Sequence, residues 1–272
     1  MKVVHVIPIS RGILLDRLSY FTSQNVALGS TVSVPLRKKI VHAVVVGIED
    51  ASTIKSDLKS SSFALRKLEH VESHDFLSEA FMQSAAQTAD YYASSTGSVL
   101  HALIPKTLLA GLREVHTPEL SEKIKNNNTS SEQLVLQAED EERFTHYKSL
   151  IREEFARHAS VFMCVPTVED ISKAQRALEK GIEQYTYIFH SGLTKKRFVE
   201  LWNKLLAETH PVLIVATGQY MCVPRKDIGT IIVEREGSRA YKIPSRPFLD
   251  IRTFASIYAK KIHARLLFGD ML

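Results

Sequence analysis

Cysteine is scarce in this sequence, and the shortage excludes two classes of protein. Only Cys164 and Cys222 occur among the 272 residues, and both stand inside apolar runs. Two cysteines cannot build the disulfide framework of a small secreted domain, and on their own they make a poor zinc site. We therefore expect two buried thiols in a protein of a reducing compartment.

Long apolar runs are lacking as well. No stretch approaches the roughly 20 residues that a membrane-spanning helix needs. The first eleven residues are apolar, but His5 and Pro8 interrupt them and no small-residue cleavage site follows, so the pattern is not that of a signal peptide. The sequence predicts a cytoplasmic protein without a membrane partner.

A strong charge of one sign is also missing. The chain has 35 Lys and Arg against 30 Asp and Glu, which gives a net charge of +5. This modest excess favours a polyanionic partner, although an ordinary basic surface would carry the same charge. No Ser-His-Asp, Cys-His or paired-acid arrangement stands out, so we predict no catalytic residue.

The first part of the chain predicts a small β-rich domain. Short β-branched segments at residues 3–9, 31–34 and 40–48 are separated by turn residues. Apolar residues spaced by threes and fours then predict a helix over residues 76–92. A polar stretch rich in asparagine and serine at residues 111–131 has the composition of a surface linker.

The second part alternates strands and helices, which predicts a parallel, three-layer α/β sheet. The expected strands cover residues 133–137, 161–165, 187–189, 212–216, 230–233 and 265–268. The expected helices cover residues 144–155, 167–181, 195–206 and 251–263. The hydrophobic content of 44% is sufficient for two ordinary domains, each with a core.

An acidic loop follows the first of these strands. Residues 134–144 have the strand-loop-helix order of a nucleotide-binding fold, but a phosphate loop needs glycines and a lysine. Four acidic residues stand there instead: Glu139, Asp140, Glu141 and Glu142. Carboxylates satisfy the positive end of a helix dipole that would otherwise hold an anion. The loop therefore predicts a stable helix start that repels a nucleotide.

Segments in both parts of the chain fit the motifs of one family in the same order. Residues 29–35 fit G-x-x-V-x-V-P, and residues 89–105 fit A-x-Y-Y followed by G-x-x-L-x-x-A-L-P. Residues 165–167, 190–193 and 230–242 align with V-P-E, with H-S-x-L, and with a strand that leads into a D-E-E-H box. Together these segments resemble the bacterial replication-restart helicases of the PriA family, also called primosomal protein N′.

The resemblance implies a domain that binds the 3′ end of a nascent DNA strand, followed by a RecA-like lobe of the P-loop NTPase type. We place a PriA-like 3′-end DNA-binding domain at residues 1–110, the linker at 111–131 and a degenerate first helicase lobe at 132–272. We find no segment that resembles the family's winged-helix insert, cysteine-rich zinc module or second RecA-like lobe.

The chain departs from the family where ATP and magnesium would bind. Arg143 replaces the phosphate-loop lysine, Phe144 replaces the hydroxyl residue after it, and Glu234 replaces the metal-binding aspartate of the box. Gly237 replaces the histidine of the box. We expect Glu234 and Glu236 to be structural carboxylates at a sheet edge, and neither ATP nor magnesium to be a cofactor.

The resemblance also indicates where DNA would bind. The family's F-D-Y motif, whose acidic residue reads the 3′ terminus, is Leu18-Ser19-Tyr20 here. Ser19 offers a hydroxyl without charge, and Asp16 is the nearby acidic residue that could replace the missing carboxylate.

Other candidate DNA contacts come from the residue types themselves. Basic clusters contact phosphates, and exposed tyrosines stack on unpaired bases. Cations at the start of a helix interact unfavourably with its dipole, which suggests that they bind a ligand. On these grounds we nominate Arg37, Lys38, Lys39, Tyr91, Tyr92, Lys195 and Lys196. A solvated basic turn, a core tyrosine and an ordinary helix start are the structural alternatives.

The leading hypothesis is a non-catalytic DNA-binding protein of replication or replication-fork restart. Its expected partner is forked or single-stranded DNA, and replisome or primosome proteins are further candidates. One alternative is an ATPase that uses Arg143 and Glu234 and takes its second lobe from another chain. The other is a replisome interaction module that has lost DNA binding.

Overall fold

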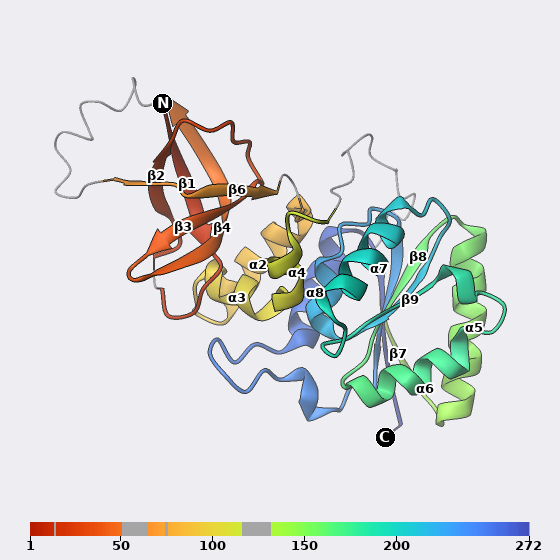
Figure 1. Ribbon diagram of the computed structural model, residues 1–272. Coiled ribbons are helices and arrows are strands. Elements are labelled where there is room, and N and C mark those ends of the chain that lie inside the picture. The colour runs from red at the N-terminus through yellow and green to blue at the C-terminus, as the bar shows by residue number, and fades with distance from the viewer. Residues whose placement is uncertain (14, 51–64, 74–75, 116–131, 272) are drawn as a thin grey trace.

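The computed structural model describes residues 1–13, 15–50, 65–73, 76–115 and 132–271. It contains two six-stranded sheets with a group of helices between them (Figure 1). Most of the linker predicted at 111–131, and Leu272 at the end of the last segment, lie outside the described residues.

The first sheet is formed by the N-terminal part of the chain. Its strands are β1 (Lys2–Pro8), β2 (Leu18–Thr22), β3 (Thr31–Leu36), β4 (Lys39–Asp50), β5 (Arg66–Lys67) and β6 (His70–Ser73). They follow the order β5-β2-β1-β4-β3-β6, and every neighbouring pair is antiparallel except β2 with β5. The β-rich N-terminal domain predicted from the sequence is confirmed.

The two faces of this sheet bury their side chains against different parts of the molecule. On one face the valines at positions 4, 6, 32, 34 and 45 form a small cluster with Tyr20. On the other face Ile7, Ile9 and Val44 join a much larger core that includes the helices. Alternation along each strand sends neighbouring residues to opposite faces, which explains how one short sheet serves two cores.

Three helices follow the first sheet and attach it to the rest of the molecule. They are α2 (Glu79–Tyr91), α3 (Thr96–Leu103) and α4 (Lys106–Gly111), and serine side chains cap the first two at Ser78 and Ser95. A side chain at Gly97 would collide with the Pro8 carbonyl, so glycine allows α3 to lie against β1. Phe81 of α2 makes an edge-on contact with Phe254 of the second part, with ring centroids 5.2 Å apart.

The second sheet is wholly parallel, as the strand-helix alternation predicts. Its order is β7-β12-β11-β8-β10-β9. The strands are β7 (Gln133–Gln137), β8 (Ser160–Cys164), β9 (Thr186–Phe189), β10 (Leu213–Ala216), β11 (Ile228–Glu234) and β12 (Arg265–Asp270). Three of the four interior strands, β8, β10 and β11, are buried along their whole length, as expected for a sheet covered on both faces.

Helices cover both faces of this sheet and complete a three-layer α/β unit (Figure 1). The core on one face includes α5 (Asp140–Ala156) and α6 (Val168–Leu178), and the core on the other includes α7 (Lys195–Ala207) and α8 (Ile251–Lys261). Three short 3-10 helices, η1 (Glu183–Tyr185), η2 (Gly218–Cys222) and η3 (Arg239–Tyr241), lie in the connections. This architecture is consistent with a RecA-like lobe, so the predicted fold class is confirmed.

The order of the strands decides which residues share the carboxyl edge of the sheet, where α/β proteins place their ligands. Strand β11 is an interior strand of the sheet, so Glu234 at its end stands well inside the sheet. Glu234 therefore lies at the carboxyl edge of the sheet, in an interior strand and not on an edge strand. Among the described helices, none has the length and apolar character that crossing a bilayer requires.

Candidate functional site

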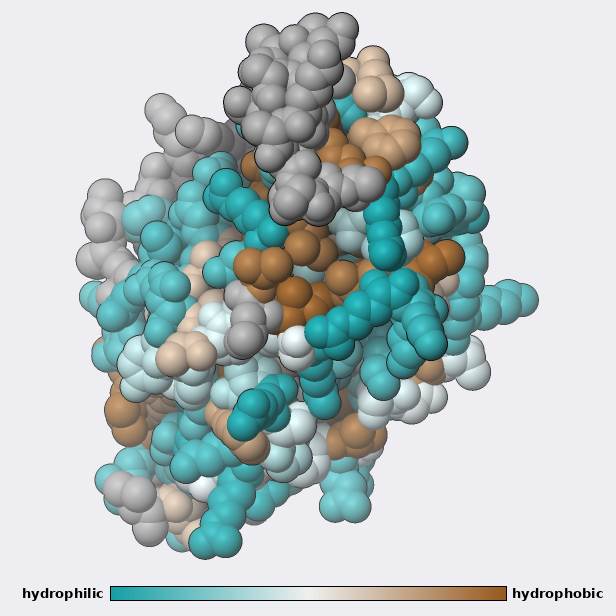
Figure 2. Space-filling view, turned by 90° about the vertical axis from the view of Figure 1, so that its left-hand side faces the viewer, coloured by the Kyte–Doolittle hydropathy of each residue, from teal (hydrophilic) through white to brown (hydrophobic). Residues whose placement is uncertain are grey.

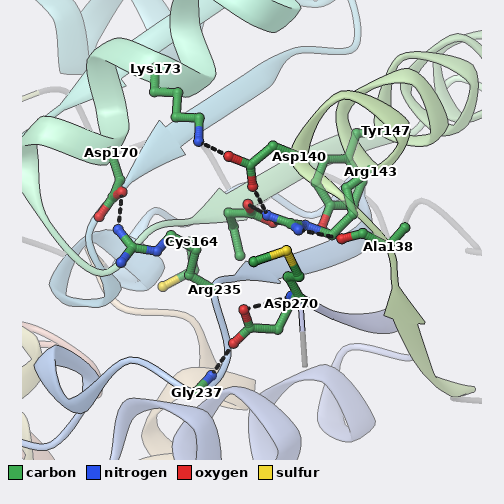
Figure 3. A network of polar contacts seen from close by, with 12 residues as sticks. Ala138, Asp140, Arg143, Tyr147, Cys164, Asp170, Lys173, Arg235, Gly237 and Asp270 are labelled. Atoms are coloured by element: carbon green, nitrogen blue, oxygen red, sulfur yellow. Dashed lines mark hydrogen bonds and ion pairs between the residues drawn. The ribbon is translucent and has the colours of Figure 1, made fainter.

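Arg143 and Glu234 form a buried ion pair at the carboxyl edge of the second sheet (Figure 3). Arg143 Nη2 lies 2.6 Å from Glu234 Oε1, and the Arg143 Nε donates to Glu234 Oε2 at 3.3 Å. The Tyr147 hydroxyl donates to the same Oε2 at 2.7 Å. Both carboxylate oxygens of Glu234 are thus bonded within the chain, and only 2% of the residue is exposed.

The local sequence makes this arrangement possible. Helix α5 brings Arg143 and Tyr147 to one face, because residues four apart lie one above the other. A side chain at Gly269 of β12 would collide with the Tyr147 hydroxyl, so the glycine leaves the space through which Tyr147 reaches Glu234. Phe144, at the predicted hydroxyl position, packs edge-on against Tyr147 with ring centroids 5.7 Å apart and is buried.

Both terminal nitrogens of Arg143 make further bonds. Nη1 donates to the Ala138 carbonyl at 2.6 Å, and Nη2 bonds Asp140 Oδ1 at 2.6 Å. Asp140 in turn pairs with Lys173 of α6. The first turn of α5 contains Asp140, Glu141 and Glu142, as the acidic loop predicts, although Glu139 caps the helix without a side-chain hydrogen bond.

The protonation states follow from these contacts. Burial by itself would lower the pKa of Arg143, but its bonds to Glu234 raise that pKa above the ordinary value. Burial and the charge of Glu234 raise the pKa of Tyr147 far above its usual range, so its hydroxyl remains a donor. The bonds from Lys173 and Arg143 hold the pKa of Asp140 below its ordinary value. The site therefore keeps its charges as mutually neutralising pairs near neutral pH.

Glu236 does not share a site with Glu234, although the sequence brings them two positions apart. Its carboxylate and its carbonyl both accept from Arg252 Nη1 of α8, at 3.2 and 2.6 Å. Between them, Arg235 points the other way and pairs with Asp170 of α6 at 2.6 Å. The Gly237 N–H donates to Asp270 at 2.6 Å (Figure 3). The four residues of the degenerate box are thus distributed over four separate contacts.

The predicted basic cluster lies at the tip of a hairpin in the first sheet. Arg37 and Lys38 form the two-residue turn between β3 and β4, and Arg37 adopts a φ of 55°. The structure brings Arg66 of β5 beside them, since Arg66 Nη1 donates to the Arg37 carbonyl at 3.5 Å, and Lys67 follows Arg66 in the same strand. Sequence reasoning missed these two residues because their separation along the chain conceals the contact.

The five cations of this hairpin cluster are available to a ligand. We define the cluster as Arg37, Lys38, Lys39, Arg66 and Lys67. All five are exposed, and none forms an ion pair with a carboxylate among the described residues. On the side of the molecule that carries this sheet, hydrophilic side chains surround a patch of apolar surface (Figure 2).

Ser19 and Asp16, the candidates for reading a strand terminus, make different contacts. Ser19 faces His5 across β1 and β2, with Oγ 3.0 Å from His5 Nδ1, and His5 Nε2 lies 3.2 Å from Glu49 Oε1. Asp16 accepts from the Thr96 N–H at 3.0 Å and so caps the start of α3. The structure therefore does not bring Ser19 and Asp16 to one point.

The two tyrosines nominated for stacking occupy different environments. Tyr91 is 71% exposed. The Tyr92 hydroxyl donates to Thr253 Oγ1 and accepts from the Asp250 N–H, both at 3.1 Å, so it joins α2 to α8. Tyr91 is thus the better placed of the two to meet a base.

The two lysines at the start of α7 also differ. Lys195 pairs with Glu114 at 2.6 Å, whereas Lys196 is exposed and has no ion-pair partner in the described part of the chain. Thr194 caps the helix by accepting from the Arg197 N–H at 3.3 Å. Lys196 is therefore the freer cation of the pair.

Comparison with known proteins finds sequences similar to this chain. The family model of the PriA 3′ DNA-binding domain matches residues 6–105, which run from within β1 through helices α2 and α3. Replication restart protein PriA of Helicobacter pylori strain 26695 is 23% identical over 261 residues, and that of strain J99 is 24% identical over 262 residues. The chain is a divergent PriA-like protein.

The similarity to PriA extends beyond the N-terminal domain. Each alignment includes 93% of this chain, so it continues through the second sheet. The chain spans 40% of the length of these curated PriA relatives. The PriA-like pattern recognised in the sequence is confirmed.

Proposed function

We propose that this PriA-like chain binds forked or single-stranded DNA in replication restart, and that it does so without an ATP-driven step. The observation that carries the proposal is a contrast between two regions. The five cations of the hairpin cluster have no carboxylate partner among the described residues, whereas an ion pair occupies the helicase-like site. The match of residues 6–105 to the PriA 3′ DNA-binding domain supports DNA as the ligand.

The first half of the proposal rests on electrostatics. Cations that have no carboxylate partner can neutralise phosphates and release counterions, which makes binding salt-dependent. The exposed ring of Tyr91 adds a surface on which an unpaired base could stack. Ser19 supports a hydrogen bond to a strand terminus through its hydroxyl, next to His5.

The second half rests on the contacts of Glu234 and Arg143. A magnesium ligand needs a free carboxylate oxygen, and both oxygens of Glu234 are already bonded. A phosphate-binding cation needs free donors, and Arg143 donates to Glu234, Asp140 and Ala138. Phe144 supplies no hydroxyl for the metal. The residues present do not fit ATP with magnesium, and we assign no catalytic residue.

Fluorescence anisotropy with forked and single-stranded DNA tests DNA binding. We expect affinity to fall steeply between about 50 and 200 mM salt. The variant Arg37→Ala/Lys38→Ala/Lys39→Ala should reduce the slope of log affinity against log salt by about 0.9 for each phosphate that the protein no longer neutralises. Binding without salt dependence, or an unchanged slope in this variant, would contradict the role of the hairpin cluster.

A matched control removes the same number of cations from another surface. Lys148 and Arg152 on α5, and Lys180 after α6, are exposed and lie on the face of the second sheet that α5 and α6 cover, away from the hairpin cluster. Replacing these three by alanine should leave the salt slope unchanged. An equal reduction of the slope in both variants would indicate a general effect of net charge.

An ATPase assay with and without DNA tests the alternative enzyme hypothesis. We expect no DNA-stimulated hydrolysis by the chain alone. Hydrolysis that disappears in Glu234→Gln would overturn the second half of the proposal and leave DNA binding untouched.

A further inference from the structure

Strand β7 is an open edge of the second sheet. Among the described residues it pairs with β12 alone. Val135 is 78% exposed and Leu134 is 43% exposed. At the opposite edge of the same sheet, Tyr187 and Phe189 of β9 are buried. The side chains named are thus exposed on one edge strand of the sheet and buried on the other.

None of the usual means of protecting an edge is present on β7. Sheet edges are commonly blocked by prolines, lysines, bulges or very short strands. The sequence of β7 is Gln-Leu-Val-Leu-Gln, which has neither proline nor charge, and its pairing with β12 is regular over all five residues. An edge of this kind is a template for a further strand.

A pocket of about 460 Å³ lies beside this edge, on the α8 side of the sheet. Val135 and its neighbour on β12, Phe268, contribute apolar lining. Thr253 and Ser256 of α8 also line it. Among the strands, helix α8 packs chiefly on β11 and β12, and the hollow lies between α8 and β7. Its size is in the range of pockets that hold small ligands or a few side chains.

The charge of the pocket indicates what kind of partner fits. Its lining contains three carboxylates, of Glu236, Asp250 and Asp270, and one guanidinium, of Arg252. Arg252 pairs with both Glu236 and Asp250, and Asp270 has no ion-pair partner among the described residues, so the lining keeps a net negative charge. A second copy of this chain would bring a second acidic lining against the first, whereas a basic segment would be attracted.

We propose that β7 and this pocket form a docking site for an extended segment of a partner protein with basic residues on both sides of an apolar anchor. The segment adds to the edge of the sheet as a further strand, and its anchor side chain enters the pocket over Val135 and Phe268. Backbone hydrogen bonds supply affinity, and the pocket and charge supply selectivity.

Peptide binding tests the proposal on the full chain. The probe is a fluorescein-labelled peptide, Lys-Lys-Thr-Val-Phe-Val-Thr-Lys-Lys, measured by anisotropy. A peptide with prolines in place of both valines cannot add as a strand and should bind at least about tenfold more weakly. A peptide with glutamates in place of the lysines should bind more weakly to a similar extent at low salt, roughly tenfold.

A variant of the pocket separates binding of the anchor side chain from electrostatic attraction of the basic peptide. Ser256→Trp places a large side chain in the pocket and should weaken binding of the lysine peptide at least about tenfold by excluding its anchor. The matched control is Ser149→Trp on the exposed face of α5, which should not change the affinity. Circular dichroism establishes that both variants fold, and the proline comparison needs no variant at all.

Amide hydrogen exchange locates the binding surface. The lysine peptide should slow exchange in residues 133–137 and leave β9 unaffected. Equal binding of the proline peptide, or no protection of β7, would overturn the proposal. Protection of β7 without peptide in a concentration-dependent dimer would also overturn it, because the occupant would then be a second copy.

Discussion

The two sheets of this protein differ in whether their charged side chains are exposed or paired. In the first sheet, the hairpin cluster exposes five cations without carboxylate partners among the described residues. At the carboxyl edge of the second, Arg143 and Glu234 are buried and bonded to each other. A polyanion can approach the first surface at little cost, but it would have to break existing ion pairs at the second.

The difference teaches that net charge is a poor guide to where a polyanion binds. Near Glu234, cations are also abundant, with Arg143, Lys173 and Arg235 close together (Figure 3). Each is matched to its own carboxylate, in Glu234, Asp140 or Asp170. What distinguishes the hairpin cluster from the surroundings of Glu234 is therefore that its cations have no carboxylate partners within the described part of the chain.

The largest expected effect comes from breaking the buried pair. Glu234→Gln leaves the Arg143 guanidinium buried without its main counter-charge, and removing one partner of such a pair costs about 3–5 kcal/mol. We expect the free energy of unfolding, measured by urea denaturation, to fall by that amount. DNA affinity of the folded variant should not change, because the hairpin cluster is on the other sheet.

A double variant sharpens this expectation. Replacing both partners by apolar residues, Arg143→Met with Glu234→Leu, removes the unpaired charge and should recover most of the stability that Glu234→Gln removes. If Glu234→Gln alone does not change the free energy of unfolding, the pair is not buried as described. The contrast between the two sheets would then be wrong.

Tyr91 and Tyr92 provide the second test, because adjacent residues divide between the two roles. Tyr91→Ala should weaken binding of single-stranded DNA by about 1–3 kcal/mol if a base stacks on the exposed ring, with little change in stability. Tyr92→Phe should cost about 1 kcal/mol of stability, since it removes the hydrogen bonds to α8. Anisotropy and urea denaturation of both variants separate the two effects.

Local pattern was sufficient to predict the strands and main helices of the second part, and β1, β3, β4 and α2 of the first, but not β2, β5, β6, α3 or α4. The strand at residues 133–137 is found at the predicted positions, and the acidic residues after Glu139 begin α5 as expected. These features depend on alternation, spacing and capping within a few residues of one another. The parallel sheet follows from the same alternation of strands and helices.

Long-range contacts could not be predicted in the same way. The pair between Arg143 and Glu234 joins residues 91 positions apart, and its geometry depends on the order of strands and on Gly269. The position of Glu234 within the sheet and the approach of Arg66 to the hairpin have the same origin. Sequence alone indicated which residue types were unusual, and the fold decided what each one touches.

Acid pH should give a third and smaller effect, a loss of stability at the contact between Asp250 and Arg252 in the second part of the chain. Although burial alone would raise the pKa of Asp250, its bonds to Arg252 hold that pKa below the ordinary value of 3.8. Because the folded pKa is depressed, this contribution to stability is present above pH 3.8 and disappears as the pH falls through the folded pKa.

The variant Asp250→Asn tests this contribution and retains the cap of α8, since asparagine is also a good N-cap. Its free energy of unfolding should be about 1 kcal/mol lower than that of the unmodified chain at pH 7. The two curves should converge below the folded pKa of Asp250. A constant difference down to low pH would show that the carboxylate charge is not what stabilises this contact.

The smallest expected effect separates neighbouring lysines at the start of α7. Lys196 has no ion-pair partner in the described part of the chain, whereas Lys195 is bonded to Glu114. If unpaired cations are the ones that meet DNA, Lys196→Ala should lower the salt slope by up to about 0.9 without changing stability. Lys195→Ala should instead cost about 0.2–1 kcal/mol of stability, as is usual for an exposed pair. The contrast between the sheets assumes that a cation with a carboxylate partner is less available to phosphate. Equal effects of both variants on DNA binding would contradict that assumption.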